Sequence, residues 1–287
     1  MAKAAPSKTA TKPKAVTKPK AATEPAVKTT AAKPVAPFVW YDVMTTDMDA
    51  ATAFYKKVVG WDIKDSGMGG PLYSILWKEG TMVGGLMPIP DDAKAMGARP
   101  AWMGYIGVDD VDEMAKKVKN AGGSIYRPPS DIPDVGRFAV VADPHGAGFM
   151  LFKPNAGPAP TPIPLGTPGH IGWHELHAGN GDEAFNFYSG LFGWTKGDSM
   201  NMGAMGVYQM FKTGGEDVGG MMTKMPEMPM PTWLYYFNVD KIDAAAERAK
   251  KAGGKIVNGP MEVPGGQWIV QCLDPQGAMF AMVAPKK

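Results

Sequence analysis

The sequence predicts an α+β fold made of two tandem copies of one domain, each built of two βαβββ units. The first observation is an internal repeat, in which Phe54-Tyr55 and Gly60-Trp61 recur 133 residues later as Phe187-Tyr188 and Gly193-Trp194. The second is that strand-like runs and amphipathic helical runs follow one another in the same order inside each copy. The third is the length of 287 residues, which suits two domains that each bury a core.

The repeat extends well beyond these aromatic residues. Its other matching positions have offsets between 131 and 135 residues, and they include Val83/Val218, Val108/Val239, Ala121/Ala252 and Asp143/Asp274. A tandem duplication explains this pattern. Chemistry that belongs to the shared framework should therefore occur in both copies, and residues that differ mark positions where the copies have specialised.

The first unit of the first copy is expected to begin with a strand over residues 38–44. Asp47 is suited to cap the helix that follows, because its side chain can accept from the free backbone amides of the first turn. Apolar residues then recur at helical spacing until Gly60 ends the helix. Residues 73–77 and 82–87 are expected to form short strands.

The second unit repeats this order. Residues 102–108 are expected to form a strand, and Asp110 to cap a helix that ends at Gly122-Gly123. Residues 138–142 and 149–152 then form a hairpin around a turn at residues 143–146, which has Pro and Gly where a type I turn favours them. In the second copy, helices are expected near residues 182–192 and 242–252.

Composition divides the chain into four segments: a Lys/Ala/Pro-rich tail over 1–37, domains over 38–154 and 170–286, and a Pro/Gly linker over 155–169. The tail is expected to be disordered, since it has too few large apolar residues to offset the entropy of ordering. It carries eight lysines and one acid, Glu24, hence a net charge of +7, which leaves −5 of the formal +2 for the rest. The tail could therefore hold nucleic acid through counterion release, although it could equally be a solvated extension.

Cysteine content and hydropathy indicate the compartment. The chain has one cysteine, Cys272, so it has no internal disulfide framework and suits a reducing environment. We find no apolar run of the length that spans a bilayer. The sequence therefore predicts a cytoplasmic protein that does not bind membranes, either a monomer whose two domains form an intrachain pseudo-dimer or a homodimer.

The helix end Phe-Tyr-x-x-x-x-Gly-Trp, the helix start Val-Asp-(Asp/Lys)-(Val/Ile)-Asp and the Asp-Pro-x-Gly hairpin resemble the vicinal oxygen chelate superfamily, which includes glyoxalases, bleomycin-resistance proteins and extradiol dioxygenases. The resemblance is strongest to a two-domain, glyoxalase-like bacterial branch that includes a mycobacterial secreted antigen and proteins described as hydroxylases. It covers residues 37–286. It implies one curved eight-stranded sheet per domain, cupped around a cavity.

The resemblance also implies where the catalytic members of the superfamily hold a divalent metal. The corresponding positions are Trp40 and Trp173 on the first strand, Met103 and Leu234 on the fifth, and Met150 and Ala281 after the Asp-Pro-x-Gly turn. None of these side chains is an imidazole, carboxylate or thiolate, the ligands that such metals require. We therefore expect no metal site and no cofactor.

Strand alternation predicts what faces each cup instead. The first strand places Trp40 with Asp42, and its repeat places Trp173 with Glu175; the fifth strand adds Tyr105 in one copy and Tyr236 in the other. An indole, a carboxylate and a phenol suit a flat, apolar small molecule held by stacking and hydrogen bonds. The alternative is that the aromatic side chains simply fill the cups.

The second copy has additional features. Glu175 and His177 share a strand face and could form a general acid–base pair, whereas the first copy has Met44 in place of the histidine. A methionine-rich stretch over residues 200–230, expected to lie mainly in loops, could repack around varied apolar ligands. We therefore favour the second domain as the site that binds or sequesters a small apolar or aromatic compound. The alternative is a glyoxalase-like lyase or hydroxylase activity that uses Glu175 and His177.

Overall fold

The computed structural model describes residues 1–4, 35–155 and 163–287. Most of the predicted tail and part of the predicted linker lie outside these residues. The chain divides into Met1–Ala32 and a second unit, Lys33–Lys287, which contains every helix and strand described below. None of the helices in the described residues is both long and apolar enough to cross a membrane.

The first domain is one open, mixed sheet of eight strands in the order β2-β3-β4-β1-β5-β8-β7-β6. Its strands are β1 (Phe38–Thr45), β2 (Asp62–Asp65), β3 (Ser74–Lys78), β4 (Thr81–Pro88), β5 (Ala101–Gly107), β6 (Ser124–Ile132), β7 (Gly136–Ala142) and β8 (Gly148–Pro154). Its helices are α1 (Met48–Val58), α2 (Asp91–Ala95) and α3 (Val111–Asn120).

The second domain repeats the sheet as β10-β11-β12-β9-β13-β16-β15-β14. Its strands are β9 (Ile171–Ala178), β10 (Thr195–Asn201), β11 (Val207–Lys212), β12 (Asp217–Thr223), β13 (Thr232–Asn238), β14 (Lys255–Glu262), β15 (Trp268–Leu273) and β16 (Met279–Ala284). Its helices are α4 (Gly181–Phe192), α5 (Ile242–Lys251) and the 3₁₀ turn η1 (Gly203–Met205).

This architecture confirms the predicted α+β fold with tandem cupped sheets. The expected elements omitted the edge strands β2 and β6, whose sequences are polar or contain two prolines. The sequence analysis also expected some methionines in loops that in fact lie in strands. Met200 lies in β10, and Met221 and Met222 lie in β12. A loop rich in methionine does follow β12, over residues 224–231.

Helix α1 forms where the local pattern predicts it. The Asp47 carboxylate accepts from the Ala50 amide at 2.9 Å, which satisfies one of the free donors of the first turn. Phe54 and Tyr55 lie on the buried face. Gly60 follows the helix with a φ of 81°, a conformation that side chains with a Cβ rarely adopt.

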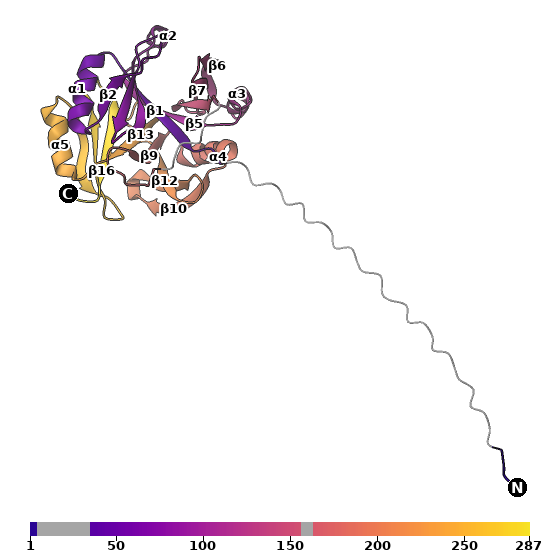
Figure 1. Ribbon diagram of the computed structural model, residues 1–287. Coiled ribbons are helices and arrows are strands. Elements are labelled where there is room, and N and C mark those ends of the chain that lie inside the picture. The colour runs from indigo at the N-terminus through magenta and orange to yellow at the C-terminus, as the bar shows by residue number, and fades with distance from the viewer. Residues whose placement is uncertain (5–34, 156–162) are drawn as a thin grey trace. The chain divides into compact units, whose positions relative to one another are not determined.

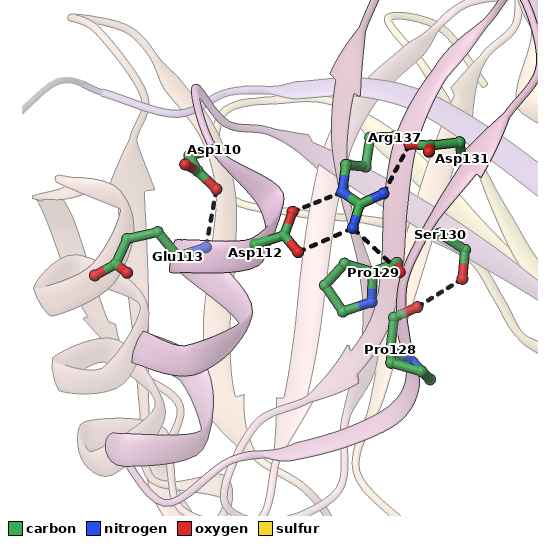
Figure 2. Close-up of polar contacts among 8 residues, drawn as sticks. All are labelled: Asp110, Asp112, Glu113, Pro128, Pro129, Ser130, Asp131 and Arg137. Carbon is green, nitrogen blue, oxygen red and sulfur yellow. Dashed lines mark hydrogen bonds and ion pairs between the residues drawn. The ribbon is translucent and has the colours of Figure 1, made fainter.

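An ion-pair cluster on the surface ties helix α3 to the β6–β7 hairpin (Figure 2). The Arg137 guanidinium donates to both carboxylate oxygens of Asp112, at 2.6 and 2.9 Å, and to Asp131 at 2.8 Å. Asp110 caps the same helix by accepting from the Glu113 amide. The bidentate geometry fixes the helix against the edge of the sheet, where β6 is paired on one side only.

The helical faces of the two sheets share one core. A single cluster of buried apolar side chains draws on both domains. Helix α1 of the first domain lies beside α5 of the second (Figure 1). The ring centroids of Phe54 in the first domain and Phe280 in the second lie 5.7 Å apart. Their repeat counterparts, Phe187 in the second domain and Phe149 in the first, lie 6.5 Å apart. A helix of each domain therefore places an aromatic ring against a strand of the other domain.

Reciprocal hydrogen bonds join the domains at repeated positions. The Trp61 indole donates to the Gly169 carbonyl, and the Trp194 indole donates to the Ala36 carbonyl, both at 2.7 Å. The Gly104 amide of the first domain also donates to the Tyr235 hydroxyl of the second, at 2.8 Å. The domains are thus related by an approximate two-fold axis, and neither buries its core alone.

Close to that axis, Tyr41 meets its repeat counterpart His174. The His174 Nδ1 atom lies 2.7 Å from the Val218 carbonyl, which can only accept, so Nδ1 carries the proton. Nε2 is then the acceptor for the Tyr41 hydroxyl at 2.6 Å. Burial disfavours the charged imidazole and lowers the pKa of His174 from the usual 6.5 to about 4.

This pKa shift predicts an acid-sensitive interface. Between pH 6.5 and 4 the unfolded chain binds the His174 proton more readily than the folded chain, so the free energy of unfolding falls as pH falls, by about 3 kcal/mol in all. Urea unfolding at pH 7 and pH 4.5 measures this. His174→Gln keeps an acceptor for Tyr41 without the titration, so its stability should depend less on pH. Equal pH dependence in both proteins would contradict the assignment.

Candidate functional site

In the first cup, three side chains donate hydrogen bonds to the buried carboxylate of Asp42. Asp42 accepts from the Trp40 indole at 3.0 Å and from the Tyr73 hydroxyl at 2.7 Å on one oxygen. Its other oxygen accepts from the Tyr105 hydroxyl at 2.5 Å. Burial raises the pKa values of Asp42 and of both tyrosines, so the phenols stay protonated and act as donors.

The second cup repeats this network on Glu175. The Tyr208 hydroxyl donates to Oε2 at 3.1 Å and the Tyr236 hydroxyl to Oε1 at 2.9 Å. The Trp173 indole donates to the Tyr208 oxygen at 2.8 Å. The structure therefore brings together the indole, carboxylate and phenol that strand alternation predicts in each cup.

Each cup contains a second tyrosine that strand alternation did not predict. Tyr73 and Tyr208 repeat with an offset of 135 residues, so the self-alignment contained the signal. Tyr73 lies in the expected strand over residues 73–77, one residue before β3, but alternation along a strand does not show which of its two faces turns toward the cup. Glycines make room for these phenols. A Cβ at Gly85 would collide with the Tyr73 hydroxyl and the Asp42 carboxylate, and one at Gly220 would collide with the Tyr208 ring.

The two cups differ at the carboxylate's remaining neighbours. His177 stands where the first domain has Met44, and Gln271 stands where it has Val140. The Gln271 amide donates to the Tyr236 hydroxyl at 2.9 Å and lies 3.4 Å from Glu175 Oε1. Gln271 could not be predicted from the repeat, because the repeat identifies positions that match and the two copies differ here.

His177 is the polar side chain of this site that lacks hydrogen-bond partners. It is 8% exposed, and its Nε2 atom lies 2.9 Å from Glu175 Oε1. This contact is an ion-pair distance, and neither ring nitrogen makes a hydrogen bond with a described residue. Leaving buried polar atoms without hydrogen bonds costs about 1–3 kcal/mol. A polar group that reached the ring nitrogens of His177 would therefore gain a hydrogen bond that the protein itself does not make.

Apolar side chains line the rest of the second cup. Leu234, Tyr236, Ala281 and Val283 form a small packed cluster that is separate from the interdomain core. Half-buried Trp173, Ile269 and Met279 lie against it. The floor of the cup is therefore filled by side chains of the protein.

The donor set does not fit a divalent metal. The positions that the superfamily uses for ligands hold Trp40, Met103 and Met150 in the first cup and equally unsuitable side chains in the second. Among the residues that the structure describes, no group of three or more His, Cys, Asp or Glu side chains is placed to hold a metal ion. The chemistry of either cup is thus left to the phenols, the carboxylates and His177.

A hollow of about 620 Å³ lies away from both cups, between α3 and α4. Its lining includes Glu183, Asn186 and Phe187. It lacks the buried, hydrogen-bonded polar cluster that marks the cups, and we assign no function to it.

Comparison with known proteins agrees with the fold. The family described as Glyoxalase/Bleomycin resistance protein/Dioxygenase superfamily matches residues 38–151 and 168–282. CFP32 of Mycobacterium bovis, whose name assigns it provisionally as a glyoxylase, is 37% identical over 252 residues, covering 86% of this chain and 94% of its own. The anthracycline biosynthesis protein DnrV of Streptomyces peucetius is 31% identical over 269 residues, covering 88% and 94%.

Solved structures resemble this chain in fold alone. The Mn(II)-bound glyoxalase from Novosphingobium aromaticivorans has a TM-score of 0.62 at 18% identity, covering 88% of this chain and 83% of that chain. The 2,3-dioxygenase LapB from Pseudomonas sp. KL28 has a TM-score of 0.58 at 13% identity, covering 88% and 93%.

Proposed function

Because this chain belongs to the Glyoxalase/Bleomycin resistance protein/Dioxygenase superfamily, we propose that its second domain binds or sequesters a small, flat, apolar compound through side chains rather than a metal. The observation that carries the proposal is His177, whose Nε2 atom lies 2.9 Å from the Glu175 carboxylate and whose ring nitrogens make no hydrogen bond with the described residues. A ligand hydroxyl or carbonyl would supply the missing hydrogen bond.

The surroundings of His177 support the flat, apolar character of the ligand. Trp173 offers a half-buried aromatic surface whose N–H is already satisfied, and Met279 offers a polarizable thioether. The relative DnrV is named for anthracycline biosynthesis, and anthracyclines are flat polycyclic aromatic compounds. The first cup supports the choice by contrast, since Asp42 and its three donors are satisfied by one another.

Calorimetric titration with 1,8-dihydroxy-3-methylanthraquinone, a flat neutral probe, tests this proposal. His177→Met installs the residue of the first cup and should weaken binding by tenfold or more, the effect of about 1.4 kcal/mol expected when a polar group of the ligand loses its partner. Met44→Leu is the matched control in the first domain and should leave binding unchanged. Equal affinities for wild type and His177→Met would contradict the proposal.

A second candidate function is proton transfer at this cup. The imidazole of His177 lies 2.9 Å from the Glu175 carboxylate, as in a general acid–base pair, and the name of the relative CFP32 points to glyoxylase chemistry. Exchange of the carbon-bound protons of hydroxyacetone in D₂O, followed by NMR, measures such activity. The wild-type protein should accelerate exchange and His177→Met should not. A wild-type rate equal to that of buffer would exclude this candidate.

A further inference from the structure

A second hollow, of about 330 Å³, lies in the second domain where β12 ends. Its walls come from the turn around η1 and from the methionine-rich loop after β12. The residues that line it are Ala204, Met205, Gly206, Thr223, Lys224, Met225 and Pro226. Thioether and methylene groups thus surround a single lysine.

The strand register places this hollow close to His177. Strands β9 and β12 run parallel, with His177 paired to Met222 and Ala178 paired to Thr223. The Lys224 amide continues the ladder by donating to the Ala178 carbonyl at 2.7 Å. Since neighbouring strands lie about 4.8 Å apart, the hollow begins at Thr223, one residue beyond the strand partner of His177.

Lys224 is a fixed cation without a counter-ion. Its ammonium group donates to the Met228 carbonyl at 2.7 Å, and it forms no ion pair with any carboxylate of the described residues. Its counterpart in the first domain is Ile89, whose amide makes the equivalent bond to Thr45 and whose side chain is 2% exposed. The second domain therefore has a charge where the first has a buried aliphatic group.

We propose that Lys224 and this hollow form an anion subsite of the second-domain ligand site. The ligand is then a flat apolar compound that carries a carboxylate or a similar acidic group at one end, an assignment that rests on the proposed function. Glu175 favours a neutral group beside His177, and Lys224 favours an anionic group at the mouth. The two charges together set the direction in which the compound lies.

Two probes that differ in one substituent test the subsite: 1,8-dihydroxy-3-methylanthraquinone and its analogue with a carboxyl group in place of the methyl. Wild type should bind the carboxyl probe about fivefold more tightly, a modest ratio because Lys224 is partly exposed and its field is screened. Lys224→Ile, which copies the first domain, should remove this preference without changing the affinity for the methyl probe. Lys224→Arg should retain it.

The outcomes separate the two proposals. Equal affinities for both probes in wild type, or a preference that survives Lys224→Ile, would overturn the anion subsite while leaving methyl-probe binding at His177 intact. Failure of both probes to bind would overturn the subsite together with the proposed function. A preference for the carboxyl probe that shrinks at higher salt and disappears in Lys224→Ile supports the subsite.

Discussion

Replacing Trp194 with alanine is expected to lower the free energy of unfolding by about 3–5 kcal/mol, the range for a large aromatic side chain removed from a packed core. Trp194 is 2% exposed and stacks on Phe211 and Tyr188 with ring centroids 4.6 and 5.3 Å away. It also holds the Ala36 carbonyl across the domain boundary at 2.7 Å. The substitution removes packing and leaves that carbonyl without its donor.

Because the core is shared, both domains should unfold together in this variant. Calorimetry and urea unfolding should show one cooperative transition at a lower midpoint. Tyr126→Ala is the control, since Tyr126 is 49% exposed and its loss should change stability by less than about 0.5 kcal/mol. Two separate transitions in the Trp194 variant, with one domain left at wild-type stability, would contradict the shared core.

Replacing Glu175 with alanine in the otherwise unchanged protein is expected to lower the free energy of unfolding by about 3–5 kcal/mol. Three buried donors, the hydroxyls of Tyr208 and Tyr236 and the amide of Gln271, converge on this carboxylate. Without it, the phenols lose their acceptor in a place that water reaches poorly. Glu175→Gln keeps the size and one acceptor oxygen, so its effect on stability should be smaller.

The same two variants separate stability from binding. Glu175→Gln should still fold and should weaken binding of the neutral anthraquinone probe by tenfold or more, because the charge beside His177 is lost. Thermal unfolding gives the first quantity and calorimetric titration the second. If Glu175→Ala loses less than about 1 kcal/mol, the network around Glu175 is not buried and bonded as described.

The sequence predicted the repeated framework well because its signals are local. Helix α1 has its cap at Asp47 and its glycine at Gly60, and both lie within one or two residues of the helix ends. The edge strand β6 was not predicted, because Pro128 and Pro129 are residues that usually interrupt a β-strand. A strand that is paired on one side only tolerates them. The packing of Phe54 on Phe280 could not be predicted, because an amphipathic helix reveals that it has a partner but does not identify it.

For the candidate site, the repeat predicted the two carboxylates and the aromatic residues next to them, since strand alternation assigns neighbours on one strand to a face. It did not predict what lies across the sheet. Gln271 reaches Glu175 from β15, and Lys224 directly follows β12, the strand that pairs with the strand of His177. Both are positions where the copies differ, and only the three-dimensional register connects them with His177.

We expect the second cup, and not the first, to bind the ligand. The chain has four histidines, so long-range ¹⁵N–¹H NMR of the imidazole rings reports on His177 directly. On addition of 1,8-dihydroxy-3-methylanthraquinone, the ring nitrogens of His177 should shift while those of the buried, bonded His174 stay in place. Unchanged His177 signals, accompanied by shifts of the Met44 methyl group in the first cup, would contradict the claim.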